Sequence, residues 1–314
     1  MTKLAALPLA ALSIALFASA SSAQGGAAYT VVESGRQFSH LQDAVSDIGG
    51  GRGTIRVAGG VHQDCAVQTA GQIAYVATAA GQAVFDGVTC EGKAALVLRG
   101  TSASVDGLVF THMRVPDFNG AGIRLEHGDL TVTQSWFRDS QQGILTGPDP
   151  DGSLSIDKST FTRLGTCEGS GGCAHSVYVG DYGAAKVTRS RFEAGRGGHY
   201  LKSRAAHIDV EDCSFDDSAG HQTNYMIDLP GGATGRIAGN WFVQGPSKEN
   251  HSAFIALAAE GKANSSAGLV IEDNDARFAP NVPWPSVFVA DWSGDPVQIG
   301  RNKLDPRLTV KERR

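Results

Sequence analysis

The sequence predicts an all-β protein whose chain winds into a parallel β-helix, a solenoid with a short helix over its N-terminal end. Val, Ile, Phe and Thr recur in short runs broken by Gly, Asp, Asn and Ser, as in chains of many short strands joined by turns. The 314 residues include 40 glycines, well above the usual share. One six-residue pattern also recurs every 23 to 34 residues, as the repeats of a solenoid do.

The N-terminus has the pattern of a secretory signal peptide. Lys3 precedes an apolar run over residues 4–17, and small residues at 21–23 form a cleavage site. We therefore expect residues 1–23 to be removed and residues 24–314 to form one β-helix domain in the periplasm or outside the cell. No later stretch is long and apolar enough to predict a membrane span.

An N-terminal cap is expected at about residues 29–58. Residues 29–32 predict a strand, and the apolar residues between 38 and 48 recur at helical spacing. A solenoid exposes its core at each end, so an amphipathic helix there indicates a cap. Strands are expected at 54–58 and 73–78.

The repeated pattern begins with a β-branched residue and ends, five positions later, with a large apolar one. Its fourth residue is usually small and polar. The mean spacing of about 28 residues suits a β-helix better than a β-propeller, whose blades need about 40 residues and four strands. The copies are Val105–Phe110, Val132–Phe137, Ile156–Phe161, Val187–Phe192, Val210–Phe215, Ile237–Phe242, Ile271–Ala276 and Ile299–Leu304.

The small residues of this pattern are expected to stack at one turn of successive coils, about 4.8 Å apart. The column they would form is Ser135, Ser159, Ser190, Cys213, Asn240, Asn274 and Asn302. The final apolar residues, Phe192 and Phe215 among them, would form a second column in the core.

The five cysteines allow at most two disulfides. Cys65 and Cys90 are 25 residues apart, about one coil, so we expect them to pair. Cys167 and Cys173 flank a glycine-rich insertion, and we expect them to close it. Cys213 is then left as a free thiol, buried in the stacked turn.

Residues 29–64, YTVVESGRQFSHLQDAVSDIGGGRGTIRVAGGVHQD, resemble the opening of right-handed parallel β-helix proteins of the pectate-lyase-like superfamily. The resemblance implies a right-handed solenoid. That fold carries lyases, hydrolases, epimerases and non-enzymatic adhesins. No motif here matches the calcium-and-arginine signature of pectate lyases. The cofactor is therefore left open: Ca²⁺ is compatible with the family, but no motif indicates it. The closely spaced Lys202 and Arg204 resemble the Lys and Arg pair of the chondroitinase B and alginate lyase group.

Three successive coils align at His175–Tyr178, His199–Lys202 and Tyr225–Asp228. The third residue of each is apolar and is expected to point into the core, so the fourth points outward. Arg124 and Leu145 occupy the same column in preceding coils. This outward column would line the floor of an extended groove.

The residue types in this column suit β-elimination from a uronic acid. That reaction needs a cation beside the carboxylate, a base for the C5 proton and a proton donor for the leaving oxygen. Lys202 is expected to face solvent and act as base, with Arg204 holding the carboxylate and Asp228 orienting Lys202. The expected catalytic residues are Lys202, Arg204, Tyr178 and His199. The expected substrate-binding residues are Arg124, His175, Tyr225 and Asp228.

The charge pattern favours a polyanionic ligand. The chain has a net charge of −5, yet residues 186–204 contain six basic residues and one acid. Nucleic acid is disfavoured, because aromatic residues are not interleaved with the basic ones. We therefore expect a monomeric lyase of an acidic polysaccharide. A C5 epimerase, a hydrolase using Asp228 and Asp181, and a non-catalytic binding protein remain alternatives, as does a purely structural role for these charges.

Overall fold

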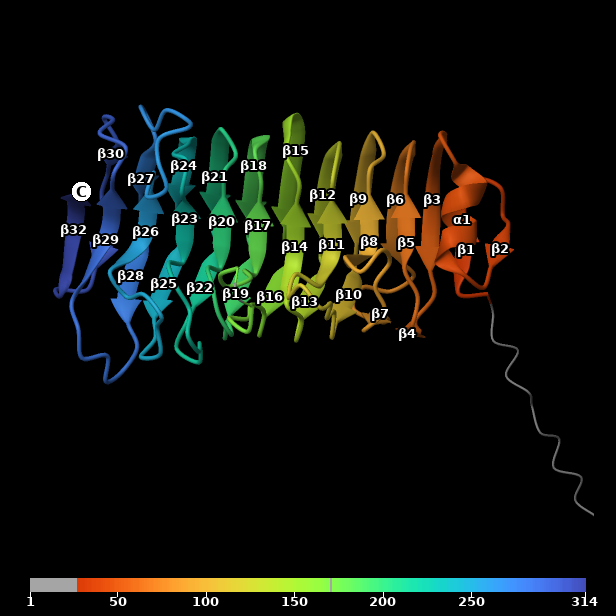
Figure 1. Cartoon of the computed structure of the whole chain (residues 1–314), viewed down its shortest axis with the longest axis horizontal. Helices are drawn as coiled ribbons and strands as arrows, with labels where there is room; N and C mark the ends of the chain where they lie inside the picture. Colours follow the sequence, from red (N-terminus) through yellow and green to blue (C-terminus); the bar gives the residue numbers. More distant parts are fainter. Residues whose placement is uncertain (1–26, 170) are drawn as a thin grey trace, which may run out of the picture.

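The structure, a computed structural model, describes residues 27–169 and 171–314. The expected signal peptide lies outside them. The described chain winds into a right-handed parallel β-helix, confirming the predicted fold. Each coil contributes one strand to each of three long sheets, called A, B and C in chain order, which run along the molecule (Figure 1).

Sheet A has twelve strands, all parallel except at its N-terminal edge, where β1 is antiparallel to β2 and β3. Its strands are β1 (Tyr29–Val31), β2 (Gln37–Phe38), β3 (Arg52–Val57), β6 (Gln72–Ala77), β9 (Ser102–Asp106), β12 (Asp129–Thr133), β15 (Asp149–Asp157), β18 (Tyr182–Thr188), β21 (His207–Glu211), β24 (Thr234–Ala238), β27 (Val270–Glu272) and β30 (Gln298–Ile299).

Sheets B and C have ten parallel strands each. Sheet B contains β4 (Gly60–His62), β7 (Ala83–Asp86), β10 (Leu108–Thr111), β13 (Trp136–Arg138), β16 (Thr160–Thr162), β19 (Arg191–Glu193), β22 (Ser214–Asp216), β25 (Trp241–Gln244), β28 (Asp275–Phe278) and β31 (Lys303–Leu304). Sheet C contains β5 (Ala66–Gln68), β8 (Ala94–Leu98), β11 (Ala121–Leu125), β14 (Gln142–Thr146), β17 (Val177–Val179), β20 (Leu201–Ser203), β23 (Ile227–Leu229), β26 (Ala253–Leu257), β29 (Ser286–Asp291) and β32 (Leu308–Arg313).

A column of stacked phenylalanines forms the sheet B side of the core. Neighbouring rings lie 4.8 to 5.5 Å apart and are nearly parallel, and every member is at most 1% exposed. Ring stacking adds to the burial of a large apolar area. The inward position predicted for Phe192 and Phe215 is confirmed. The members are Phe85, Phe110, Phe137, Phe161, Phe192, Phe215 and Phe242.

The predicted polar column forms the turn between sheets A and B. The hydroxyl of Ser159 accepts a hydrogen bond from the backbone N–H of Ser135 at 3.2 Å, and Asn274 Oδ1 accepts one from the N–H of Asn240 at 3.0 Å. In these pairs the later coil satisfies a buried donor of the coil before it, which an apolar residue could not do. Cys213 lies in this column, buried and unpaired as predicted.

Helix α1 (Leu41–Ile48) covers the N-terminal end of the core, as expected. It begins three residues later than the helical spacing predicted, because Phe38 belongs to β2. The backbone N–H of Leu41 donates to the carboxylate of Asp64 at 2.7 Å, so a side chain outside the helix satisfies one of its free N-terminal donors. Cys65, which follows Asp64, forms the predicted disulfide with Cys90.

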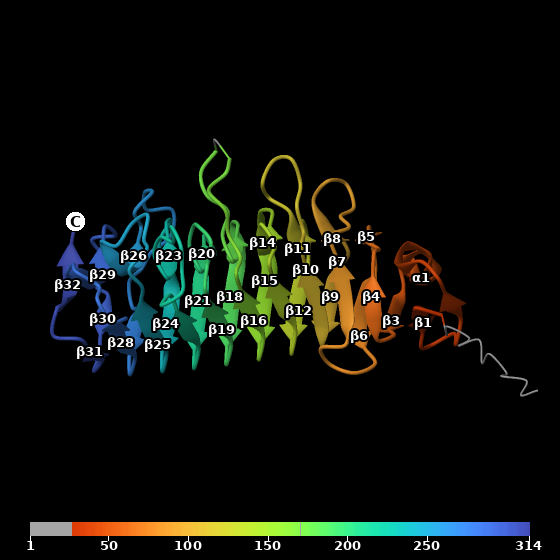
Figure 2. The same cartoon turned by 90° about the horizontal axis from the view of Figure 1, so that it is seen from below.

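Long loops between sheets B and C project from one edge of the solenoid, following β7, β10 and β16 (Figure 2). The first contains Cys90 and the third is closed by the predicted disulfide between Cys167 and Cys173. These loops stand beside the outer face of sheet C. That face is therefore walled on one side along several coils.

Candidate functional site

The predicted outward column lies on sheet C in the predicted register. Arg124 pairs with Leu145, Leu145 with Tyr178, Tyr178 with Lys202, and Lys202 with Asp228, each one strand apart. The neighbouring apolar residues are fully buried. The alternation of side chains along each strand thus places the column on the outside.

Two adjacent glycines position the start of this site. Gly198 has a φ of 61°, and a Cβ there would lie 2.1 Å from the carbonyl oxygen of Ala174 in the coil before. Only glycine allows these turns to approach so closely. His199 consequently lies over His175, and its backbone N–H donates to His175 Nδ1 at 3.0 Å. The glycines beside the basic stretch therefore bring two imidazoles together.

Lys202 lies in the predicted column but does not face open solvent, and that expectation was wrong. Its side chain is only 9% exposed. The ammonium contacts Asp228 Oδ2 at 3.1 Å and Glu260 Oε1 at 2.5 Å. Glu260 comes from the turn after β26, two coils further along, and was not among the predicted site residues. The coil repeat gives no signal for such a contact, because that turn is not periodic.

The electrostatics oppose a base role for Lys202. Burial lowers its pKa, but the charges and hydrogen bonds of Asp228 and Glu260 outweigh that effect, so the net shift is upward. Lys202 is therefore held as a cation. Burial also raises the pKa of Asp228 to about 6, although Lys202 opposes the rise. Its Oδ1 atom is buried and has no hydrogen-bond partner.

The two histidines are neutral. Burial lowers the pKa of His175 to about 3 and that of His199 well below its usual value. His175 Nδ1 accepts a hydrogen bond, so the neutral ring carries its proton on Nε2. His199 Nε2 lies 3.5 Å from Asp228 Oδ2. His199 thus joins His175 to the Lys202–Asp228 pair.

Arg204 and Tyr178 form the more open half of the site. Arg204 Nε donates to the phenol oxygen of Tyr178 at 2.9 Å. A second nitrogen of the same guanidinium contacts Glu260. The Arg204 side chain is 34% exposed, so it can reach a ligand without a change in the fold.

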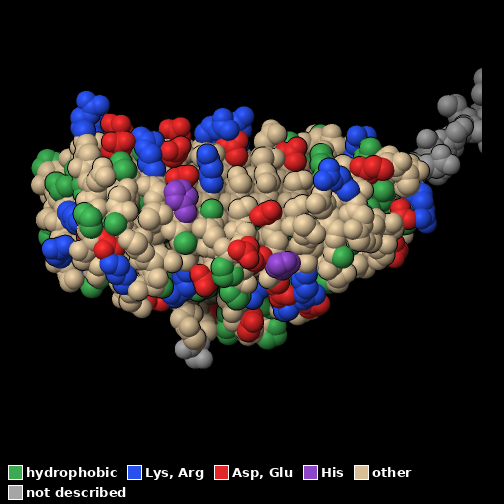
Figure 3. Space-filling model, turned by 90° about the horizontal axis from the view of Figure 1, so that it is seen from above, with side chains coloured by type: hydrophobic (Ala, Val, Ile, Leu, Met, Phe, Trp, Pro, Cys, Tyr) green, Lys and Arg blue, Asp and Glu red, His purple; other side chains and the backbone are tan. Residues whose placement is uncertain are grey.

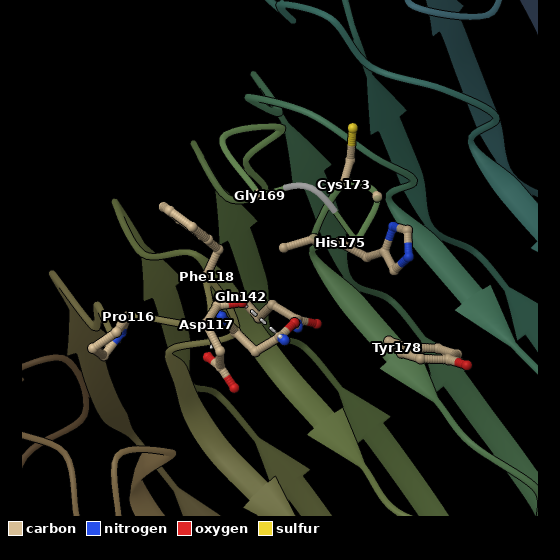
Figure 4. Close-up of a pocket in the computed structure, with 12 residues that line it drawn as sticks. Pro116, Asp117, Phe118, Gln142, Gly169, Cys173, His175 and Tyr178 are labelled. Carbon is tan, nitrogen blue, oxygen red and sulfur yellow. Dashed lines mark hydrogen bonds between the residues drawn. The ribbon is translucent and has the colours of Figure 1, made fainter.

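Two cavities meet over this half of sheet C. One, of about 430 Å³, lies between the loops after β10 and β16 (Figure 4). His175 and Tyr178 line one side of it, with Asp117 and Gln142 opposite. The other, of about 460 Å³, is lined by Tyr178, Arg204 and Arg124, among others. Tyr178 and Asn119 line both, so the two cavities adjoin at these side chains, and together they are called the groove below.

The structure does not bring every predicted residue to this groove. Tyr225 is 9% exposed and packs in a small apolar cluster with Ala256 and Ala290. Its ring lies 5.6 Å from that of His199, centroid to centroid. Asp181 lines the second cavity, whereas Asp228 is covered by its neighbours. Arg124 reaches the cavity as predicted and lies 3.6 Å from Glu126.

The basic run at residues 186–204 does not form one surface patch, contrary to expectation. Its residues are distributed over sheets A, B and C as the chain winds round. On the face drawn in Figure 3, basic and acidic side chains are intermingled. Three arginines of the run pair with acids: Arg189 with Asp157 at 2.7 Å and Arg196 with Asp139 at 3.5 Å in other coils, and Arg191 with Glu193 of the run itself at 2.6 Å. The positive character of the site thus rests on Arg124, Lys202 and Arg204.

Within residues 27–169 and 171–314, no group of three or more His, Cys, Asp or Glu side chains is arranged to hold a metal ion. No helix in the described part of the chain is long and apolar enough to cross a membrane.

Comparison with known proteins supports the fold. No protein-family model and no curated protein matches the sequence. The structure is similar to ORF18 of Geobacillus virus E2, with a TM-score of 0.50 and 12% identity over 87% of this chain. This chain spans only 56% of that protein. It is also similar to pectin methylesterase from Aspergillus niger, with a TM-score of 0.50 and 10% identity over 93% of this chain and 91% of the other.

Proposed function

We propose that this protein is an exported lyase that cleaves an acidic, uronic-acid-containing polysaccharide by β-elimination. The observation that carries the proposal is the contact between Arg204 and Tyr178 in a groove that Arg124 also lines. A cation for the substrate carboxylate and a proton-transfer group are thus joined by one hydrogen bond. The likeness to a pectin methylesterase is consistent with a uronan as the ligand.

In the proposed reaction, Arg204 and Arg124 hold the carboxylate of the sugar and draw charge from C5. Arginine suits this role because its planar fork matches a carboxylate. The phenol oxygen of Tyr178 takes the C5 proton, and the hydrogen bond that Arg204 donates to this oxygen stabilises negative charge on it. The C4–O4 bond breaks as the C4=C5 double bond forms. Tyr178 then returns the proton to O4.

The buried residues play supporting parts in this proposal. His175 lines the first cavity, and in the proposed complex its Nε2–H would donate a hydrogen bond to the bound sugar. Lys202, held as a cation by Asp228, contributes a second positive charge to the binding of the carboxylate beside Arg204. His199 connects these two parts of the site. The base role expected for Lys202 from sequence passes to Tyr178.

The proposal is tested by incubating the protein with a panel of uronans and following the ultraviolet absorbance of the unsaturated product. Tyr178→Phe should lower turnover by about 10²–10⁴-fold with binding largely kept. Arg204→Ala should weaken both binding and turnover. Tyr182→Phe removes a buried phenol on sheet A and is the matched control. Full activity of Tyr178→Phe would refute its assigned role.

A hydrolase is the second candidate, because Asp228 and Glu260 both contact the Lys202 ammonium. The pKa of Asp228 is raised by burial, whereas hydrogen bonds from Lys202 and Arg204 outweigh desolvation and lower that of Glu260. Two carboxyl groups with opposite shifts can act as acid and base or nucleophile. This reading predicts new reducing ends without unsaturated product, lost in Glu260→Gln. No product with any uronan, together with salt-sensitive binding, would instead indicate a binding protein.

A further inference from the structure

The Glu260 carboxylate bridges the two cations of the candidate site. One of its oxygens contacts Lys202 and the other contacts Arg204. We infer that Glu260 is an internal substitute for the ligand carboxylate, and that exchange with it makes the Lys202–Arg204 site selective for carboxylate ligands. The inference deepens the proposed function and rests on it for the identity of the ligand.

Hydrogen bonds hold the backbone of the turn that carries Glu260. A ligand carboxylate would therefore displace Glu260 by rotation of its side chain, without movement of the turn. The N–H of Glu260 donates to the carbonyl oxygen of Pro230 at 3.0 Å, and that of Asn264 to Gly231 at 2.7 Å. Asn264 Nδ2 also donates to the carbonyl oxygen of Arg204 at 3.2 Å. The Glu260 side chain is 46% exposed, so it can swing into solvent on the fast timescale of exposed rotamers.

The charge balance explains why a carboxylate is needed. When Glu260 leaves, Arg204 loses its acidic partner and Lys202 keeps only Asp228. A uronate that enters restores the lost charge and the lost acceptors one for one. A neutral or esterified sugar restores neither, and it leaves a largely buried ammonium incompletely paired. Selectivity thus comes from the penalty on the wrong ligand as well as from contacts with the right one.

The test measures binding, with ligands that contain no glycosidic bond and cannot be turned over. Sodium D-galacturonate and sodium D-glucuronate, and the methyl ester of each, are titrated into the full-length protein while the NMR signal of the Arg204 Nε–H is followed. Glu260→Ala should lower the apparent Kd for both acids by about tenfold, since Glu260 keeps the cations occupied most of the time. The affinity for the esters should change far less.

Glu272→Ala is the matched control. It removes an acid that likewise pairs with an arginine, Arg236 at 2.9 Å, but on sheet A. It should leave uronate affinity at the wild-type value, which separates local competition from a change in net charge. Glu260→Gln should fall between the wild type and Glu260→Ala, because the amide still offers an acceptor without the charge.

The result that overturns the inference is an unchanged or weaker affinity for the acids in Glu260→Ala, or an equal gain for acids and esters. Absence of binding in both the wild type and Glu260→Ala also overturns it. Tighter binding without unsaturated product from any uronan would keep the inference and refute the lyase. Unsaturated product together with unchanged affinity in Glu260→Ala would support the lyase and refute the inference.

Discussion

Two columns of side chains run along the same coils with the same spacing, and they differ in almost everything else. The inward column on sheet B repeats phenylalanine over seven coils, with stacked rings and no exposure. The outward column on sheet C changes at every coil, through Arg124, Leu145, Tyr178, Lys202 and Asp228. One chain geometry therefore supports both uniformity and variety.

The difference shows what each side of a strand must satisfy. Inside, a residue must fill the same space as its neighbours one coil away, so one shape recurs. Outside, the backbone hydrogen bonds already fix the strand, and the side chain is free to carry chemistry. A run of unlike residues at coil spacing, most of them polar, thus distinguishes a face that can carry a site from the core.

The largest effect expected from this comparison is on the inward column. Phe192→Ala removes a ring stacked 4.8 Å from each of two others and should lower the free energy of unfolding by about 3–5 kcal/mol. Denaturant unfolding measures it. Trp136→Ala, on the outer face of sheet B and 40% exposed, should cost under about 1 kcal/mol. Equal losses in the two variants would show that the inward and outward assignments are wrong.

A smaller loss is expected at Lys202, although it belongs to the outward column. Lys202→Ala leaves the buried carboxylate of Asp228 without its cation and should cost about 2–3 kcal/mol. Protonation of Asp228 limits the cost. Adding Asp228→Asn to Lys202→Ala should recover part of the loss in thermal unfolding. If Lys202→Ala is as stable as the wild type, Asp228 is not a buried carboxylate that depends on Lys202.

An effect of similar size, spread over about two pH units, is a pH dependence of stability. Burial raises the pKa of Asp228 to about 6 in the folded protein, above its value of about 3.9 in an unfolded chain. The folded state therefore binds this proton more tightly, and its stabilising contribution is complete below pH 4 and lost as pH rises through 6. The slope from one group is at most about 1.4 kcal/mol per pH unit.

Asp228→Asn isolates that contribution. The difference in stability between wild type and Asp228→Asn, measured by urea unfolding at several pH values, should change between pH 4 and pH 6 and stay level above it. A constant difference across the window would show that Asp228 is solvated and that its pKa is unshifted.

The sequence predicts what the coil repeat controls. The strand register, the two columns, the Cys65–Cys90 disulfide and the place of Cys213 follow from residues one coil apart. The Cys167–Cys173 disulfide follows instead from the short insertion that its two cysteines flank. The cover over Lys202 does not, because Glu260 lies 58 residues away in a turn of irregular length. The dispersal of the basic run is missed for a related reason. Residues close in sequence pass through three different sheets before the chain returns to the same face.

The position of the site along the solenoid also affects how readily it unfolds locally. In sheet C, β20 has five strands on one side and four on the other, and each coil is held mainly by its neighbours. Opening near Lys202 must therefore break two coil interfaces at once, or spread inward from an end. Amide hydrogens in β17, β20 and β23 should exchange more slowly than those in β32. A protease would accordingly erode the ends of the molecule while the groove remained intact.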